Sequence, residues 1–190
     1  MQTLAYILNR GITHESLTKA NDLMRHCGDF FTVKMRDVSG VQTGKKIRYV
    51  VPRDVKEINS KGSKMGYLYL TKLNLSTHTD PLYVVEGSID RLTMLNYTDH
   101  VVGIPSIVCL QKFIKELRFI NTNCPIIIFT DTDVPSSNAV KALSERRDIN
   151  LNNVFDARSY LGKHKDMNDF VTAWNTIDLE DTKKHMKTLI

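Results

Sequence analysis

The spacing of hydrophobic residues changes twice along the chain. The first 30 residues predict two helices, the second with Thr13 as its N-cap and Gly28 near its end. Short apolar runs of strand character, bounded by turn-rich segments, then follow at 30–33, 47–51 and 66–70. This pattern predicts a small antiparallel sheet after the helices, and residues 73–80 are expected to form a polar linker.

After Pro81, strand and helix signals alternate. Strands are expected at 82–85, 100–104, 125–130 and 153–157, and helices at 88–96, 107–121 and 136–147. The run 126–129 is continuously apolar, which is typical of a central parallel strand buried on both faces. The alternation predicts an α/β fold with an open, mostly parallel sheet, and a charged helix is expected from Asp178 onward.

Composition narrows the class of protein. The 190 residues are 42% hydrophobic and 25% charged, which argues against wholesale disorder. No stretch approaches the roughly 20 apolar residues of a membrane helix, and the first residues do not resemble a secretory signal. The cysteines Cys27, Cys109 and Cys124 form no C-x-x-C pair, which argues against a disulfide framework and a structural zinc site. We therefore expect a cytoplasmic protein without a membrane partner.

Positive charge is concentrated in the first part of the sequence. Residues 1–80 carry 13 Lys and Arg against 7 Asp and Glu, whereas the whole chain has a net charge of +5. A basic half beside a half with clustered acids suggests an anionic substrate that one part grips and the other processes with metal ions. A solvated basic face is an equally good explanation of the charge alone.

Acidic side chains follow the predicted parallel strands. Glu86 ends the first strand with Asp90 one turn later, Asp131 and Asp133 follow the third strand, and residues 166–169 follow the fourth. Ligands of such sheets bind at the carboxyl ends of the strands, where close carboxylates repel one another unless divalent cations lie between them. Oxygen ligands without nearby His or Cys favour Mg²⁺ or Mn²⁺. A lone D-x-D is more often a solvated loop or a helix cap, so the prediction depends on all three motifs together.

These motifs, in this order, resemble the Toprim domain of primases, topoisomerases and certain nucleases, over about residues 81–175. The resemblance implies that Glu86, Asp131 and Asp133 are catalytic and work beside Mg²⁺ or Mn²⁺ in phosphoryl transfer. The metal-binding set that it implies is Glu86, Asp90, Asp131, Asp133, Asp166, Asn168 and Asp169. The usual D-x-D-x-A-G is replaced by Asp-Thr-Asp-Val-Pro-Ser at 131–136, so local contacts to metal or phosphate are expected to differ.

The N-terminal part indicates a branch of this family. Residues 6–17, Tyr-Ile-Leu-Asn-Arg-Gly-Ile-Thr-His-Glu-Ser-Leu, resemble the segment that opens the catalytic core of bacterial and phage primases. In those cores a basic α+β lobe precedes the Toprim domain, and the two form a groove for single-stranded template. The resemblance implies a template-binding lobe at 1–80 and a catalytic domain at 81–190. The candidate contacts to nucleic acid and NTPs are Arg36, Lys45, Lys46, Arg48, Arg53, Lys61 and Lys64.

The implied activity is that of a DNA-directed RNA polymerase that makes short primers on single-stranded DNA from NTPs. The sequence contains neither a zinc ribbon nor a P-loop, so a replicative helicase or a separate zinc-binding module is an expected partner. The pared-down core favours a phage or mobile-element origin. Two alternatives stay open: a metal-dependent Toprim nuclease, which uses similar acids, and a non-catalytic nucleic-acid-binding accessory protein.

Overall fold

The structure, a computed structural model, describes residues 2–20, 24–69, 75–77, 79–121 and 123–174. Its first part contains α1 (Gln2–Leu8), α2 (His14–Lys19), β1 (Met24–Cys27), β2 (Phe30–Arg36), β3 (Gln42–Tyr49) and β4 (Glu57–Asn59). The second part contains β5 (Leu82–Glu86), α3 (Gly87–Met94), β6 (Val101–Ile104), η1 (Ile107–Cys109), α4 (Leu110–Ile120), β7 (Ile126–Phe129), α5 (Val134–Ser144), β8 (Val154–Asp156), η2 (Arg158–Leu161) and α6 (Met167–Trp174).

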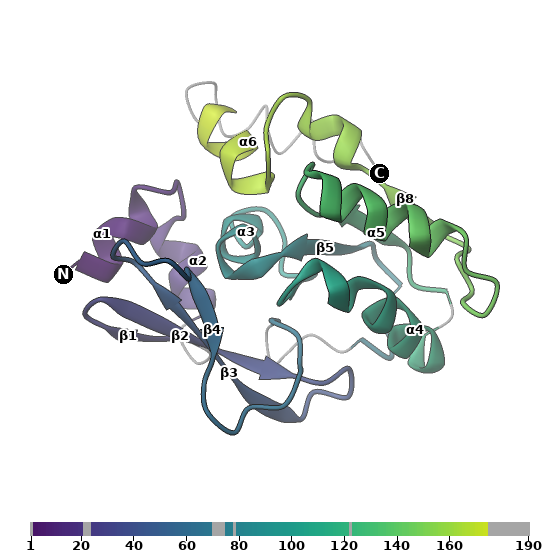
Figure 1. The fold of residues 1–190 in the computed structure, drawn as a ribbon, viewed down its shortest axis with the longest axis horizontal. Coiled ribbons are helices and arrows are strands. Elements are labelled where there is room, and N and C mark those ends of the chain that lie inside the picture. Colours follow the sequence, from purple (N-terminus) through teal and green to yellow (C-terminus); the bar gives the residue numbers. More distant parts are fainter. Residues whose placement is uncertain (1, 21–23, 70–74, 78, 122, 175–190) are drawn as a thin grey trace.

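Two four-stranded sheets organise the molecule (Figure 1). The first is antiparallel with the order β1-β2-β3-β4, and the second is parallel with the order β6-β5-β7-β8. The α/β fold class predicted from the sequence, a basic α+β part before a parallel open sheet, is confirmed. Among the described residues, no helix is long and apolar enough to cross a membrane.

The two central strands of the parallel sheet bury both of their faces. Along β5, Tyr83 and Val85 join one hydrophobic cluster, whereas Leu82 and Val84 join another on the opposite face. Helices α3 and α6 contribute to the first cluster, and α4 and α5 contribute to the second. The side-chain alternation of a strand explains this division, and the continuously apolar β7 follows from it.

A short segment joins the two sheets. Tyr67 forms an antiparallel bridge with Arg36 at the end of β2, and Leu68 forms one with Gly103 in β6. The Leu68 N–H donates to the Gly103 carbonyl, and the Gly103 N–H donates to the Leu68 carbonyl, each at 2.8 Å. Gly103 is required there, because a Cβ atom would come within 2.6 Å of the Gly87 carbonyl oxygen. The sequence predicts a full strand at 66–70, but the structure contains only these two bridges in the described part of that run.

The second predicted helix is wrong in its second half. Helix α2 ends at Lys19, and Met24–Cys27 forms the edge strand β1 instead. Gly28 has a φ of +57° and lies in the two-residue turn between paired Cys27 and Phe30. The glycine that was expected at a helix end is therefore part of a hairpin turn. Hydrogen bonds between β1 and β2 favour the strand conformation of residues 24–27 over a helix. Strand β4 was also missed, because its short sequence adjoins a turn-rich segment.

The other predicted elements are confirmed with shifts of a few residues at their ends. Thr13 is the N-cap of α2, and its hydroxyl accepts a hydrogen bond from the Ser16 N–H at 3.2 Å. The expected helix beyond Asp178 and part of the expected linker lie outside the described residues. The boundary near residue 80 stays a prediction; residues from both sides of it, including Ile12 and Leu92, share one hydrophobic cluster.

Asn96 connects the start of α2 to the end of α3. Its Oδ1 accepts hydrogen bonds from the Thr13 N–H at 3.1 Å and the Ser16 hydroxyl at 2.5 Å, and its Nδ2 donates to the Gly11 carbonyl at 2.9 Å. We expect Asn96→Ala to lower the free energy of unfolding by about 2 kcal/mol, because part-buried polar groups lose their partner. Urea denaturation measures the change. Asn138→Ala, on the exposed face of α5, should change it by less than about 0.5 kcal/mol; equal losses in both variants would contradict this role.

Candidate active site

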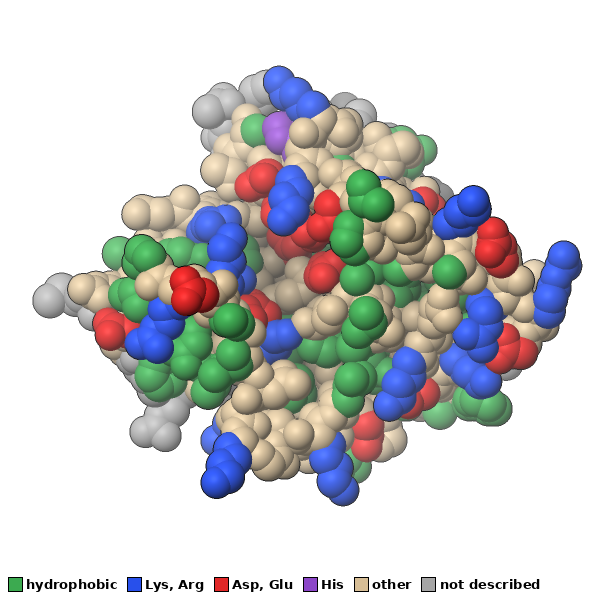
Figure 2. All heavy atoms as spheres, in the orientation of Figure 1, with side chains coloured by type: hydrophobic (Ala, Val, Ile, Leu, Met, Phe, Trp, Pro, Cys, Tyr) green, Lys and Arg blue, Asp and Glu red, His purple; other side chains and the backbone are tan. Residues whose placement is uncertain are grey.

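The carboxyl edge of the parallel sheet brings the predicted acids into one region. Glu86 ends β5 and precedes α3, which carries Asp90 in its first turn. Asp131 follows β7 after one intervening residue, and Asp166 lies directly before α6. Because parallel strands present their carboxyl ends at the same edge, residues distant in sequence meet there. Figure 2 shows acidic side chains gathered in a hollow of the surface with basic side chains beside it, and Glu86, Asp90, Asp131 and Asp166 line a cavity of the structure.

Three of the acids form a tight cluster. Asp90, Asp131 and Asp166 each offer a carboxylate oxygen, and these oxygens all lie within 4.8 Å of one another. Backbone groups hold two of them: the Asn168 N–H donates to Asp90 Oδ1 at 2.9 Å, and the Asp169 N–H donates to Asp166 Oδ1 at 2.8 Å. The start of α6 therefore fixes one side of the cluster.

Glu86 lies beside this cluster with its own support. Its Oε1 accepts a hydrogen bond from the Ile107 N–H at 3.1 Å, and its Oε2 accepts one from the Ser136 hydroxyl at 3.3 Å. Asp133 is exposed, and its carboxylate accepts from the Ser136 N–H at 3.0 Å as the N-cap of α5. Strand β7 already ends at Phe129, so Asp133 belongs to a helix cap and does not line the cavity at Asp131.

The cluster carries unfavourable charge. Burial raises the pKa of Glu86, and the charge of Asp131 raises it further. Burial also raises the pKa of Asp90 well above its usual range, with Asp166 adding to the shift. The pKa of Asp131 is raised by burial, although the hydrogen bond from Lys165 opposes the shift. Ionised carboxylates at this edge therefore need a cation to balance them.

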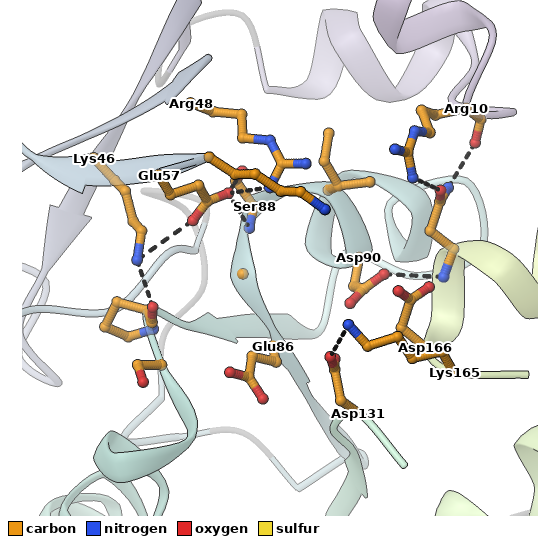
Figure 3. Close-up of a pocket in the computed structure, with 16 residues that line it drawn as sticks. Arg10, Lys46, Arg48, Glu57, Glu86, Ser88, Asp90, Asp131, Lys165 and Asp166 are labelled. Carbon is orange, nitrogen blue, oxygen red and sulfur yellow. Dashed lines mark hydrogen bonds and ion pairs between the residues drawn. The ribbon is translucent and has the colours of Figure 1, made fainter. Parts of the chain in front are cut away.

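Basic residues of the antiparallel sheet form the opposite wall of a cavity of about 330 Å³. Lys46 and Arg48 are two residues apart on β3, so they lie on the same face of the strand, and both face this cavity (Figure 3). Lys46 Nζ lies 3.3 Å from Glu57 Oε2, and Arg48 Nη1 lies 3.2 Å from Glu57 Oε1. Lys46 Nζ also donates to the Pro105 carbonyl, which ties the basic wall to the loop after β6.

The other predicted basic contacts lie away from this cavity. Lys45, Arg53, Lys61 and Lys64 are exposed and do not line it. The Arg53 guanidinium lies 4.2 Å from the Tyr49 ring centroid. Arg36 Nη1 donates to the Gly40 carbonyl at 2.8 Å, so it supports the turn between β2 and β3. The predicted basic set is therefore divided between the cavity wall and the outer surface.

Asn168 and Asp169 differ in position from the acid cluster. Asn168 is buried; its Oδ1 accepts from Arg10 Nη1 at 3.2 Å, and its Nδ2 donates to the Thr93 hydroxyl at 2.9 Å. Only its backbone N–H turns to Asp90. Asp169 is exposed and lines a neighbouring hollow instead. The side chain of Asn168 thus joins α6 to Arg10, the arginine of the R-G-I segment.

Sequence reasoning missed several residues that line the cavity. Glu57 pairs with both basic residues of β3, and its Oε1 also accepts a hydrogen bond from the Ser88 hydroxyl. Arg10, Lys56 and Lys165 line the same cavity. Arg10 belongs to the quoted segment 6–17 and Lys165 directly precedes the acidic run 166–169, so these positions were the available signal. The sequence contains no such signal for Glu57, because the strand that carries it, β4, was not predicted.

Comparison with known proteins connects this arrangement to a fold. No family model and no curated protein matches the sequence. Solved structures do match, among them the primase fragment of the bacteriophage T7 primase-helicase protein, with 21% identity, a TM-score of 0.63, and coverage of 93% of this chain and 72% of that one. The chain has the fold of a primase catalytic core.

Further matches agree with this fold. The Aquifex aeolicus primase, solved with its zinc-binding and RNA polymerase domains, matches with 16% identity and a TM-score of 0.65, over 95% of this chain and 55% of that one. A DnaG primase catalytic domain bound to single-stranded DNA matches with 15% identity and a TM-score of 0.61, over 99% and 71% of the two chains. The primase-core fold thus includes both the basic part and the parallel sheet.

The charge of Asp90 should destabilise the folded protein when no metal is present. Its folded pKa is raised, so the unfolded chain ionises first and stability falls as pH rises from the unfolded pKa through the folded one. Asp90→Asn keeps the Oδ1 acceptor for Asn168 and removes the charge. We expect it to raise the free energy of unfolding at pH 7, with EDTA present, by about 1 kcal/mol or more.

Chemical denaturation at pH 7 and at pH 4 measures this effect. The gain should shrink at the lower pH, where Asp90 is protonated in the folded protein. Asp54→Asn removes an exposed carboxylate outside the cavity and should leave stability nearly unchanged at both values. A destabilised Asp90→Asn variant at pH 7 would contradict the electrostatic explanation.

Proposed function

We propose that this chain is a primase-like, DNA-directed RNA polymerase core that makes short primers on single-stranded DNA. One observation carries the proposal: a primase-core fold in which the acid cluster and the basic wall face each other across one cavity. Neither the acid cluster nor the basic wall by itself would indicate a polymerase. Acid clusters occur without metals, and basic faces occur without nucleic acid.

The acid cluster fits a hard divalent cation. Its donors are carboxylate oxygens, they converge within 4.8 Å, and burial leaves their charge poorly balanced. Mg²⁺ and Mn²⁺ prefer such oxygen ligands. Asp90, Asp131 and Asp166 would hold the ion together with Glu86, and Asp133 would contribute its charge from the α5 cap. When bound, the ion would supply Lewis-acid polarisation of phosphate oxygens and charge neutralisation.

The basic wall would orient the phosphates of an incoming NTP. Lys46 and Arg48 are held by Glu57, so their cationic groups are fixed before a ligand arrives. Arg10 and Lys56 extend the positive charge along the cavity. In nucleotidyl transfer the 3′-hydroxyl oxygen bonds to the α-phosphorus, the bond to pyrophosphate breaks, and the hydroxyl proton leaves. Fixed cations near the departing pyrophosphate favour this step because negative charge accumulates there.

The exposed cations of the small sheet would track the template backbone. Lys45, Arg53, Lys61 and Lys64 project to solvent from strand β3 and the following loops. Phosphate contacts of this kind release counterions, so binding should weaken steeply as salt rises. By analogy with the T7 and Aquifex proteins, a helicase or a zinc-binding module is the proposed partner.

A primer-synthesis assay tests the activity. The chain is incubated with mixed-sequence single-stranded DNA, labelled NTPs and Mg²⁺ or Mn²⁺, beside the double variant Asp131→Asn/Asp133→Asn. We expect short labelled products, and a loss of about 100-fold or more in the double variant. Asp148→Asn, an exposed acid in the loop after α5, serves as the matched control and should retain activity. Metal-dependent cutting of the DNA without synthesis would favour the nuclease, and binding alone would favour the accessory protein.

Neighbouring lysines on β3 separate the cavity wall from the outer surface. We expect Lys46→Met to weaken NTP binding about tenfold or more, because its ammonium lines the cavity. Lys45→Met should leave NTP affinity within about twofold and reduce the salt slope of DNA binding by about 1. Equilibrium binding of a fluorescent NTP and of labelled single-stranded DNA measures the two effects. Equal effects of both variants on NTP binding would contradict the assignment.

A further inference from the structure

A lysine already lies among the clustered acids. Lys165 Nζ is 3.2 Å from Asp131 Oδ2 (Figure 3), and it belongs to the residue directly before Asp166. The Lys165 ammonium is therefore ion-paired with one of the three clustered acids and is next in sequence to another. Among the described residues, Lys165 is the cation whose ion pair with the acid cluster is direct.

The backbone of Lys165 is held by hydrogen bonds, whereas its side chain is largely exposed. The Thr132 N–H donates to the Lys165 carbonyl at 2.8 Å, and the Thr132 hydroxyl lies 3.2 Å from the same carbonyl. These bonds tie residue 165 to the turn between Asp131 and Asp133. The Lys165 side chain is nevertheless 59% exposed, against 17% for that of Asp131. It can leave the pair by rotation, without any change in the backbone.

A second hollow beside the first can accommodate the Lys165 ammonium when it leaves Asp131. Lys165 lines a second hollow of about 610 Å³, next to the first and open to solvent, together with Arg10, Lys163 and His164. Asp169 and Thr172 lie in the same hollow. An ammonium that leaves Asp131 thus returns to water, so its release carries no burial cost.

We propose that Lys165 is a built-in counter-ion of the acid cluster that competes with the divalent cation for Asp131. The inference rests on the proposed function only in that the acids hold a metal. In the metal-free protein the lysine offsets carboxylate repulsion and keeps the acids together. Metal binding breaks the Lys165–Asp131 ion pair and releases the side chain. The lysine therefore sets how much metal the site needs, and it stabilises the protein when metal is scarce.

Removal of the charge has two opposite consequences. Without the ammonium, a divalent cation no longer has to break an ion pair, so it binds more tightly. In the absence of metal, the same variant has lost the cation that balances the acids, so it unfolds more easily. A residue with a purely structural role would lower stability and weaken metal binding together. The opposite signs of the two effects distinguish the proposed role.

The experiment measures Mn²⁺ binding and stability on the full chain. Free Mn²⁺ is followed by electron paramagnetic resonance at fixed pH and ionic strength, for the wild type, Lys165→Met, Lys165→Arg and Lys163→Met. We expect Lys165→Met to bind Mn²⁺ about threefold to tenfold more tightly, as expected for loss of one partly exposed ion pair. Its melting temperature in EDTA should fall, and the rise on adding Mn²⁺ should exceed that of the wild type.

Lys163→Met is the matched control. Lys163 is an exposed lysine two residues from Lys165, it lines the same hollow, and its replacement removes the same charge. It should keep Mn²⁺ affinity within about twofold of the wild type, which separates the ion pair from a general field effect. Lys165→Arg retains the charge and should behave like the wild type. If Lys165→Met fails to fold, Lys165→Gln takes its place.

The remaining outcomes are distinct. Unchanged or weaker Mn²⁺ binding by Lys165→Met, with normal binding by the wild type, overturns the counter-ion role and leaves the proposed function intact. An equal gain for Lys163→Met overturns it as well, because the effect is then one of net charge. Absence of Mn²⁺ binding in all four proteins overturns the counter-ion role and the metal-dependent function together.

Discussion

Repulsion among carboxylates at the carboxyl edge of the parallel sheet is the constraint around which the site is arranged. Asp90, Asp131 and Asp166 converge within 4.8 Å, and Glu86 lies beside them. Burial strengthens their repulsion because it removes the water that would screen it. The surrounding structure answers this charge with specific groups: backbone N–H donors from the start of α6 and the ammonium of Lys165. The site is thereby prepared for a cation before one arrives.

Contacts between the first and second parts of the chain place basic residues opposite the acid cluster. Leu68 pairs with Gly103, and Lys46 donates to the Pro105 carbonyl, so the antiparallel sheet is fixed against the loop after β6. Glu57 adds a third contact through Ser88, in the first turn of α3. Each of these contacts joins the part of the chain before residue 80 to the part after it. Together they hold the basic face of β3 opposite the acids, so that one cavity contains both signs of charge.

Errors in the sequence-based predictions have a common origin. Met24–Cys27 has helical spacing but forms an edge strand, because β2 offers it a ladder of hydrogen bonds. The run at 66–70 has strand character but contributes only two bridges in its described part. Asp131 and Asp133 both follow the strand predicted at 125–130, but β7 has already ended at Phe129 and Asp133 caps α5. In each case a neighbour distant in sequence, or the precise end of an element, decided the outcome.

The sequence by itself determined the fold class, the alternation of strands and helices along the second part of the chain, and the acids that follow its strands. These depend on local periodicity and on the position of an acid relative to a strand end, which a sequence states directly. Only the tertiary structure decided which cations face the acids. Lys45 and Lys46 are adjacent in sequence, but strand alternation turns them to opposite sides. Glu57 and Lys165 entered the site through contacts between separate elements, and such contacts leave no periodic signal in the chain.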